Sequence, residues 1–524
     1  MNYKEQIKSF FRENDKISNI YFGILIVLII SIPFSPFGIS VSEFSLLGLW
    51  FFTFGFKEKF TTLFNNKSAL IFITIFLLYL VGLLYTTDIK WGLHSIKIKL
   101  PLILFPFVLL SIPRFSKKQI KILMYFLVAT IFAKTLETSA NLIFATNQFD
   151  DIRRISSISH IRFSLFIVFS IYILIYYTFI NKKNKVFDFK CIISKILIVW
   201  LSVFLFVIQS ITGIIIFIIV AYILLFYLAI ENKKRNIIAI IIIIPISILV
   251  YFIISVSNFY NTEPYVFEDF EKATANNNLY WHDTTNLELE NGNYVWIYVS
   301  QKEMKESWNK ISKLKYDSLD KGGHNLKFTL IRYLTSKGYR KDSVGISKLT
   351  KQDILNIENG IANYRFYNKY NFNNRIYKII WQFDVYLKGG NPSGHSVTQR
   401  FEFLKTAFHV IQENPFFGVG TGDIKNSIKS QYDKDNSILE KEFRKNAHNQ
   451  YVSFAVSFGI IGSIWIVFAI FYPFFKNKKY KQMLPSVFFL ISIISMLDED
   501  TWETQISVTF FALLFSLFIL RNDN

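Results

Sequence analysis

The chain has 524 residues, of which 52% are hydrophobic, 18% aromatic and only 18% charged. Its apolar residues fall in long blocks such as 20–34 and 237–254, which with their flanks can cross the ~30 Å hydrocarbon core of a bilayer as helices. This composition excludes a soluble enzyme and a disordered chain. The net charge of +20 would suit a nucleic-acid-binding surface in a soluble protein, but the positions of the charges favour a different explanation.

Twelve apolar segments predict twelve membrane-spanning helices, and the fold class is therefore mainly α, a polytopic helical bundle. We expect these spans at residues 18–34, 39–55, 69–86, 93–112, 120–146, 161–180, 192–209, 211–230, 236–256, 447–475, 483–497 and 504–520. Short segments on one side hold nearly all the loop Lys and Arg, whereas the opposite short loops hold only Lys90, Arg153 and Arg154. The positive-inside rule then predicts cytoplasmic N- and C-termini and no nucleic-acid partner.

Residues 257–446 break the membrane pattern, because they include no apolar run of spanning length. We therefore predict a membrane domain at 1–256, a soluble loop domain at 257–446 and a second membrane domain at 447–524. The predicted orientation places the loop domain outside the cytoplasmic membrane, between the ninth and tenth spans, where it is long enough for a core of its own.

Within this insert, aromatic and β-branched residues at 291–298 predict a strand, whereas 351–364 and 397–413 have helical patterns. A mixed α/β domain is therefore expected. The sequence NPFFGVGTG at 414–422 predicts the end of the second helix and an irregular loop. That loop could offer backbone N–H groups to a phosphate, although a flexible turn is the simpler interpretation.

A sharper signal lies at the start of the tenth predicted span, in the run AHNQYVSFAVSFGIIGSIW. His448 is followed by Asn449, and after nine more residues by Gly459 and Gly462 in a Gly-x-x-Gly pair. This run resembles the O-antigen ligase and O-antigen polymerase family, integral membrane glycosyltransferases whose pattern is His followed by Asn, Ser or Gln, then nine residues and Gly-x-x-Gly.

A second stretch supports the resemblance. From Arg400 to the loop at 414–422, the chain looks like the family's passage from an exported arginine to a Pro-x-x-Gly-x-Gly turn. The layout is also similar, with about twelve spans and the largest exported loop just before the motif. The insert is longer than in many family members, and residues 257–395 have no counterpart to which a family function can be assigned.

The resemblance implies an inverting, metal-independent glycosyltransferase in the bacterial inner membrane. Its partners would be a polyprenyl-diphosphate-linked glycan as donor, membrane lipids, and lipid A core as acceptor in a ligase. The acceptor would be the growing glycan in a polymerase, or a protein hydroxyl in a protein O-oligosaccharyltransferase. We expect a ligase first, because the motif looks most like the ligases' own form, and no cofactor, because the diphosphate already activates the donor.

His448 is the expected catalytic base, because an imidazole of ordinary pKa can take a proton from a sugar hydroxyl near neutral pH. A position at a helix N-terminus would disfavour its protonated form. Asn449 is expected to support it by holding the ring or the sugar. Gly459 and Gly462 share a helical face and are expected to let another helix approach closely.

Two arginines are candidate diphosphate-binding residues, because a guanidinium stays charged and its planar fork matches phosphate oxygens. Arg400 fits the exported-loop arginine that the resemblance implies, and Arg162 fits a second one at the mouth of the sixth span by position only. His160 precedes Arg162 in the run HIRF and is a supporting candidate, while Arg153 or Arg154 could take the place of Arg162.

The remaining charged residues are ambiguous. The acids of 498–500 could bind a cation or simply form a solvated turn, which is the preferred interpretation, and no His pattern indicates a metal site. Lys134 and Glu137 could pair on one helical face, whereas Lys97 and Lys99 could line a cavity for the donor.

Two other classes of function stay open. A lipid-linked glycan transporter would bind the same donor without reacting, but such proteins often show repeated halves and none is visible here. A receptor or scaffold would use the insert as a binding module and would not need the membrane charges.

Overall fold

The computed structural model describes residues 15–53, 55–112, 114–144, 156, 158–180, 189–261, 270–367, 372–395 and 397–521. It is mainly helical, as predicted. Its contacts divide the chain into two compact units, one comprising 1–231, 402–437 and 444–524 and the other 232–401 and 438–443. The predicted division into two membrane domains and a loop domain stays a prediction.

The first unit contains most of the apolar helices. They are α2 (Asp15–Ser31), α3 (Pro36–Phe52), α4 (Phe56–Phe64), α5 (Lys67–Leu83), α6 (Ile89–Lys99), α7 (Pro101–Ser111), α8 (Lys117–Phe144), α9 (His160–Ile175) with η2 (Tyr176–Ile180), α10 (Phe189–Val207), α11 (Ile211–Glu231), α19 (Ile424–Lys434), α20 (Gln450–Lys476) with η5 (Lys479–Lys481), α21 (Met483–Ser495), η6 (Thr501–Glu503), and α22 (Gln505–Phe515) with η7 (Ser516–Leu520). Helix α18 (Thr398–Glu413) confirms the predicted helix 397–413, and the division between the units falls within it.

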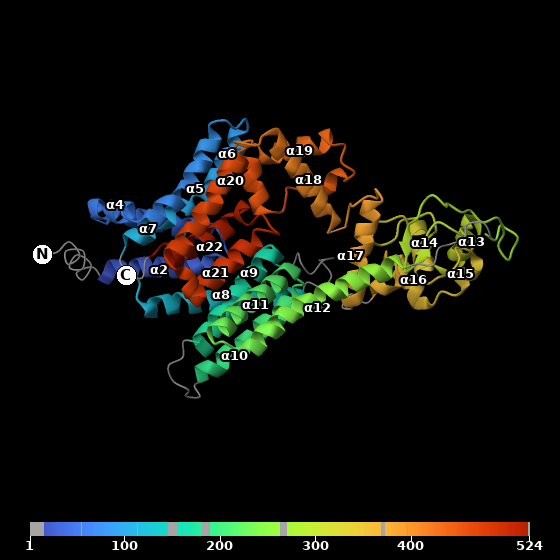
Figure 1. Cartoon of the computed structure of the whole chain (residues 1–524), viewed down its shortest axis with the longest axis horizontal. Coiled ribbons are helices and arrows are strands. Elements are labelled where there is room, and N and C mark those ends of the chain that lie inside the picture. The colour runs from blue at the N-terminus through green and yellow to red at the C-terminus, as the bar shows by residue number, and fades with distance from the viewer. Residues whose placement is uncertain are drawn as a thin grey trace. The chain divides into compact units, whose positions relative to one another are not determined.

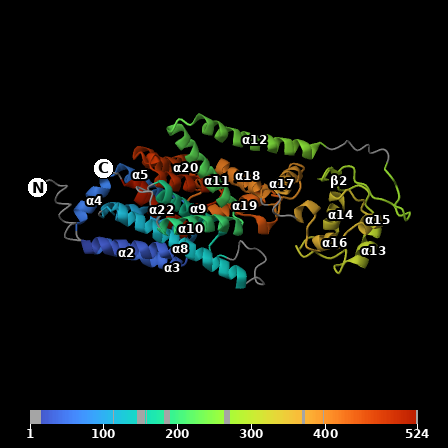
Figure 2. The same ribbon diagram turned by 90° about the horizontal axis from the view of Figure 1, so that it is seen from below.

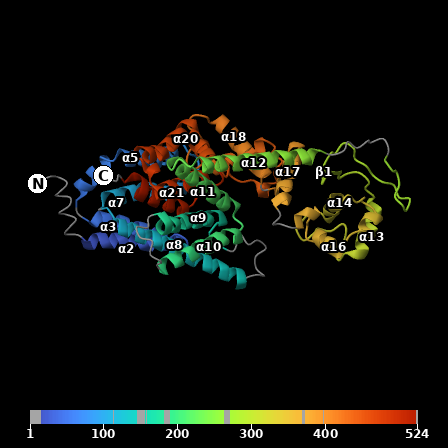
Figure 3. The same ribbon diagram turned by 60° about the horizontal axis from the view of Figure 1, so that its bottom comes forward.

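Each predicted span coincides with an apolar helix. Six helices of the described residues are long and apolar enough to cross a membrane, or seven if the bent pair α3 and α4 is one span, and the other five are shorter. The count of twelve therefore stays a prediction. Helices α5 and α20 pack side by side (Figure 1), and α9 packs against both α8 and α10 (Figure 3).

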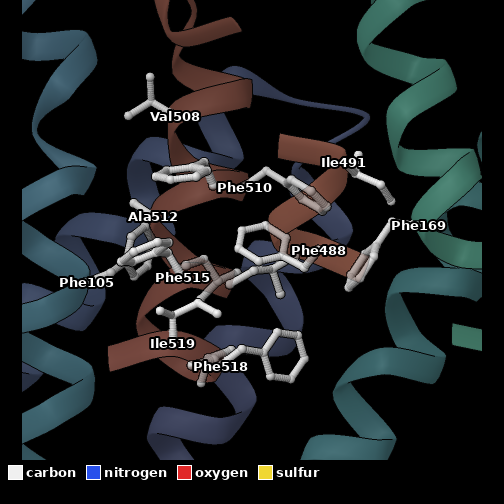
Figure 4. Packing of buried hydrophobic residues seen from close by; sticks show 14 of the residues in the cluster. Phe105, Phe169, Phe488, Ile491, Val508, Phe510, Ala512, Phe515, Phe518 and Ile519 are labelled. Carbon is white, nitrogen blue, oxygen red and sulfur yellow. The ribbon is translucent and has the colours of Figure 1, made fainter. Parts of the chain in front are cut away.

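Large apolar side chains fill the space between these helices. Phe169 of α9, Phe488 of α21 and Phe510 of α22 meet with ring centroids 5.9 to 6.4 Å apart (Figure 4). Phe515 stacks on Phe72 of α5 with ring centroids 4.4 Å apart. Because lipid tails are as apolar as these side chains, close packing holds the bundle together more than the removal of apolar surface from water does. A rigid frame results, and it fixes the helix ends that carry the charged residues.

The second unit contains α12 (Arg235–Tyr260) and most of the insert, up to residue 401 and again at 438–443, and this part is called the insert below. The insert comprises β1 (Leu289–Glu290), β2 (Asn293–Tyr294), α13 (Gln301–Ile311), α14 (Leu326–Ser336), α15 (Ser343–Ser347), α16 (Lys351–Glu358), η3 (Tyr364–Tyr367), α17 (Phe372–Leu387) and η4 (Lys441–Phe443). Helices α13 to α16 lie together (Figure 2), around a core that includes Trp308, Leu330 and Ile357.

Two predicted elements of the insert are wrong in extent. The strand predicted at 291–298 is only the two residues of β2, because Asn291 and Gly292 form the two-residue turn of a hairpin, with φ angles of 51° and 83°. Asn-Gly is the strongest short signal for such a turn. The helix predicted at 351–364 ends at Glu358, because Gly360 adopts a left-handed conformation (φ 79°) that stops it.

Candidate active site at the ends of the membrane helices

His448 lies immediately before α20 and is held in an unusual backbone conformation. Its φ of 48° is in the left-handed region, which costs energy for a residue with a Cβ atom. The side chain is 28% exposed, and its ring lies 5.6 Å from that of Phe403 of α18. The position is therefore partly shielded and still accessible.

Asn449 has a structural role that differs from the predicted one. As the N-cap of α20, it accepts hydrogen bonds through Oδ1 from the backbone N–H groups of Tyr451 (3.0 Å) and Val452 (3.1 Å). Its Nδ2 donates to the carbonyl of Leu497 at 3.0 Å. Both ends of the amide are thus engaged by the backbone, so Asn449 fixes the place where His448 leaves the helix, and its contact with a sugar stays a prediction.

The acids after α21 do not form a solvated turn. Glu499 and Asp500 are each only 7% exposed, which makes the preferred interpretation of this loop wrong. Glu499 lies between two predicted site residues, with Oε1 3.4 Å from a terminal nitrogen of Arg162 and Oε2 3.4 Å from Nδ1 of His448. The structure therefore brings Arg162 and His448 together through a carboxylate that we had not predicted to take part.

The other acids of this loop attach it to further helices. Asp498 accepts a hydrogen bond from Thr212 of α11 at 2.6 Å, and Asp500 accepts one from Ser453 of α20 at 2.7 Å. Glu503 forms an ion pair of 3.0 Å with Lys99, whose side chain is fully buried. Lys99 thus has a carboxylate partner at one end of the bundle, and the alternative that it lines an open cavity for the donor loses support.

Burial also alters the acid-base properties of the loop. It raises the pKa of Asp500 above its ordinary value, and the nearby carboxylates of Glu503 and Glu499 act in the same direction. The hydrogen bond from Ser453 and the charge of His448 oppose this change. Burial and the neighbouring carboxylates thus disfavour the charged form of Asp500.

Arg162 has a donor atom left over. Its side chain is 17% exposed, and its Nε is buried without a hydrogen-bond partner among the described residues. Since a guanidinium has five N–H groups, the contact with Glu499 leaves further donors for an anion. His160 lies in the same first turn of α9, whereas Arg153 and Arg154 lie outside the described residues.

Arg400 lies in the first turn of α18 and is partly buried. It belongs to the second compact unit, whereas His448 and Arg162 belong to the first. Its role in binding the diphosphate therefore stays a prediction from the resemblance.

One of the two glycines of the motif differs from the predicted role of admitting another helix. Gly459 breaks α20 (φ 64°, ψ −172°), and a Cβ there would lie 2.2 Å from the carbonyl carbon of Phe416. The loop at 414–422 thus approaches Gly459, rather than a helix. A Cβ at Gly462 would meet Phe458 of its own helix at 2.4 Å and Leu78 of α5 at 3.3 Å, so only this glycine admits a neighbouring helix.

The break in α20 explains why the loop at 414–422 is neither flexible nor a phosphate cradle. It frees the carbonyls of Val456 and Ser457, which accept hydrogen bonds from the N–H groups of Val419 and Gly420 at 2.9 Å each. The N–H of Thr421 donates to the carbonyl of Gly82 in α5 at 3.1 Å, and the freed N–H of Ile460 in α20 donates to the carbonyl of Pro415 at 2.8 Å. Helices α5 and α20 are neighbours in Figure 1. These loop N–H groups are therefore already used inside the protein.

Other charged candidates have protein partners. Lys134 pairs with Glu137 at 2.8 Å, which confirms that predicted pair. Two further acids that could have served a cation, Asp433 and Asp435, are also engaged, because Asp433 pairs with Arg444 and Asp435 lies 2.9 Å from His409. Among the residues that the structure describes, no three His, Cys, Asp or Glu side chains are grouped so that they could hold a metal ion.

Comparison with known families is consistent with this arrangement. A family model described as O-antigen ligase matches residues 357–496, a range that includes Arg400 and His448 but ends before Glu499 and does not include Arg162. No curated protein matches the chain. Residues 357–496 of this helical chain therefore match the O-antigen ligase family, which supports the family that the sequence resembles.

Proposed function

We propose that this membrane glycosyltransferase is an O-antigen ligase that moves a glycan from a polyprenyl diphosphate to a hydroxyl of lipid A core, on the outer side of the cytoplasmic membrane. The contact of Glu499 with both His448 and Arg162 is the observation that carries the proposal. It joins a base to a cation through one carboxylate. A binding protein or transporter has no need of such a base.

His448 acts as the general base in this scheme. When Nδ1–H faces Glu499, the neutral imidazole leaves Nε2 as the proton acceptor. Nε2 takes the proton of the acceptor hydroxyl as its oxygen forms a bond to the anomeric carbon. The bond from that carbon to the diphosphate breaks, and the diphosphate leaves with the electron pair. A single displacement of this kind inverts the anomeric configuration.

Arg162 has two tasks. It helps to hold Glu499 in place, and its remaining N–H donors stabilise the negative charge that develops on the leaving diphosphate. Arg400 is the second diphosphate contact that the resemblance implies. Since the diphosphate is already a good leaving group, the scheme requires no metal ion or other cofactor.

The proposed orientation can be tested with the single cysteine. Cys191 lies at the start of α10, which the basic loop residues assign to the cytoplasmic side together with both termini. We expect a membrane-impermeant maleimide to label Cys191 in spheroplasts only after permeabilisation. In a protein that also carries Cys191→Ser, a cysteine introduced by Lys310→Cys on α13 should be labelled without permeabilisation. The reverse pattern would contradict the proposed orientation.

The enzymatic assay supplies purified protein with a polyprenyl-diphosphate-linked glycan and three acceptors in turn, namely lipid A core, free glycan and a serine-containing peptide, in the presence of a chelator. We expect transfer to lipid A core, and a loss of about 100-fold or more in His448→Ala. The exposed His94 of α6 provides the control variant His94→Ala, which should transfer normally.

Each other outcome points to a different function. Transfer only to glycan would make the protein a polymerase, and transfer only to the peptide a protein O-oligosaccharyltransferase. Full activity in a folded His448→Ala protein would refute the role of the base. Binding of the donor without transfer to any acceptor would favour transport.

A further inference from the structure

A cavity lies within the unit that contains α12 and the insert. It measures about 350 Å³ and is bounded by the end of α12, the hairpin turn between β1 and β2, η3 and α17. Helices α12 and α17 pack against each other (Figure 3), and the hydroxyl of Tyr251 donates to Asn373 at 2.7 Å across them. Its volume is near the lower end of the range for small-molecule sites.

The lining of this cavity combines neutral polar groups with one cation. Amide and hydroxyl side chains are contributed by Tyr251, Ser255, Asn258, Asn261, Asn291, Asn373 and Tyr377. Arg365 is the one charged residue among the lining residues, which include no carboxylate. Phe259, Ile376 and Ile380 complete the wall with apolar surface.

Arg365 is held in place by its backbone, whereas its guanidinium remains available. The N–H of Arg365 donates to Asn363 at 2.9 Å, and its carbonyl accepts from Asn374 at 2.6 Å. The guanidinium lies 5.2 Å from the ring centre of Tyr377. Within the described part of the chain, no carboxylate lies within 4 Å of it. A positioned cation without an acidic partner is suited to an anionic ligand.

The floor of the cavity is rigid. The backbone N–H of Asn291 donates to the hydroxyl of Tyr377 at 2.6 Å, and its side-chain amide donates to the carbonyl of Ser336 at 2.8 Å. Below the turn, the buried Glu290 accepts hydrogen bonds from Asn363 (2.6 Å) and Arg332 (2.7 Å). A preformed floor reduces the entropy lost when a ligand binds.

We propose that this cavity binds an acidic saccharide, with Arg365 contacting its carboxylate or phosphate and the surrounding amides contacting its hydroxyl groups. The side-chain amides of Asn258 and Asn261 can bond to the hydroxyl groups of a sugar ring, whereas most of the other polar side chains of the lining are already hydrogen-bonded within the protein. The apolar wall suits the C–H face of such a ring.

The position of the cavity is consistent with a glycan of the cell envelope. Several lining residues belong to the last turns of α12, whose residues Ile238–Tyr260 form a candidate membrane span. In the proposed orientation, this end of the helix faces outward. The site is separate from His448, and the binding test does not depend on the transfer reaction.

The test measures binding of a glucuronate-containing tetrasaccharide to the full chain in phosphatidylcholine nanodiscs, with the carboxyl-reduced form of the same tetrasaccharide as the neutral probe. We expect the acidic form to bind to the wild-type protein. The reduced form should bind to the wild type at least about tenfold more weakly, and so should the acidic form to Arg365→Gln. Arg375 is exposed on α17 and does not line the cavity, so Arg375→Gln should bind normally.

Asn258→Ala provides a second test on an exposed lining residue, and it should weaken the binding of both forms of the saccharide. Equal binding of the two forms to wild type, or normal binding by both Arg365→Gln and Asn258→Ala, would overturn the proposal. Repeating the assay with phosphatidylglycerol separates the two sources of an anionic group. Loss of the saccharide signal together with Arg365-dependent binding of this lipid would identify a lipid-headgroup site instead.

Discussion

Buried carboxylates occur in both compact units, and the two units hold them in different ways. In the insert, Glu303 accepts hydrogen bonds from Ser343 (2.6 Å), Asn278 (2.8 Å) and Thr274. At the ends of the membrane helices, Glu499 is as well shielded from solvent, but its contacts with His448 and Arg162 are both 3.4 Å long. Hydrogen bonds to a charged group are normally 2.7–2.9 Å.

From this difference we propose that Glu303 is a structural acid and that Glu499 takes part in the reaction. Burial acts to raise the pKa of Glu303, but the hydrogen bonds from Ser343, Thr274 and Asn278 outweigh it and lower the pKa to about 2. Such an acid is satisfied and inert at neutral pH. A carboxylate with long contacts to a base and a cation can instead tighten when substrate binds, as catalytic hydrogen bonds often do.

The largest loss of transfer activity is expected from substitutions of Glu499, and it would distinguish this acid from Glu303. Glu499→Ala removes the acceptor that orients His448, and we expect transfer to fall by about 100-fold. Glu499→Gln retains an oxygen that can accept from Nδ1–H, so it should recover part of the rate. The measurement is kcat and KM against pH for both variants. Glu413→Gln, on the exposed end of α18, is the control.

A uniform loss of folded protein in both Glu499 variants would instead indicate a structural acid like Glu303. In that case, hydrogen exchange would increase throughout α20 and α21. The comparison would fail, because burial alone would explain both carboxylates.

The arginines of the two units provide the next largest effect. Arg162→Lys keeps the charge but removes the planar fork, and we expect about a tenfold or larger rise in KM for the donor or fall in kcat. Arg400→Gln should lower transfer to a similar extent if the resemblance assigns its role correctly. Arg444, which pairs with Asp433, provides the matched control Arg444→Gln. Loss in the Arg400 variant alone would remove Arg162 from the diphosphate site.

The sequence was sufficient to predict the apolar helices, because composition is a local feature, and a short local motif singled out His448, whose catalytic role stays a prediction. It was insufficient for Glu499, since a carboxylate in the run DEDTWE is buried only if α9, α11 and α20 all end beside it. That convergence depends on packing between segments hundreds of residues apart. The acidic run at the end of a span was the one available signal, and a solvated turn was a reasonable interpretation of it.

Two other errors have local causes. Asn291-Gly292 is a recognisable hairpin turn, but the aromatic residues after it led us to predict a single long strand. Gly459 looks like a helix-packing glycine, and its positive φ became evident only once the loop at 414–422 was seen against it. In both cases the glycine marks a backbone conformation rather than a packing face.

A smaller effect is expected from Glu303→Gln in the insert. Replacing the acceptor of several short hydrogen bonds should destabilise the insert by about 1–3 kcal/mol. Hydrogen exchange in peptides of α13 is the measurement, and transfer should stay within about twofold of wild type at a temperature where the variant is folded. A large loss of transfer without faster exchange would contradict the structural role of this acid and would assign chemistry to the insert.

The smallest effect is a pH dependence that distinguishes the insert from the membrane helices. Burial, assisted by the positive charges of Arg332 and Lys378, lowers the pKa of His395 to about 4, and its ring lies 5.3 Å from that of Trp381. In the unfolded chain this imidazole takes a proton near pH 6.5, so its neutral burial stabilises the fold fully above that pH. Stability should then fall as the pH decreases from about 6.5 towards 4.

His395→Phe retains a ring but cannot titrate, so subtracting its pH profile of hydrogen exchange in α17 from that of wild type should isolate this decrease. The same subtraction for peptides of α22 should give no change, and an equal decrease there would mean that the two units unfold together rather than separately.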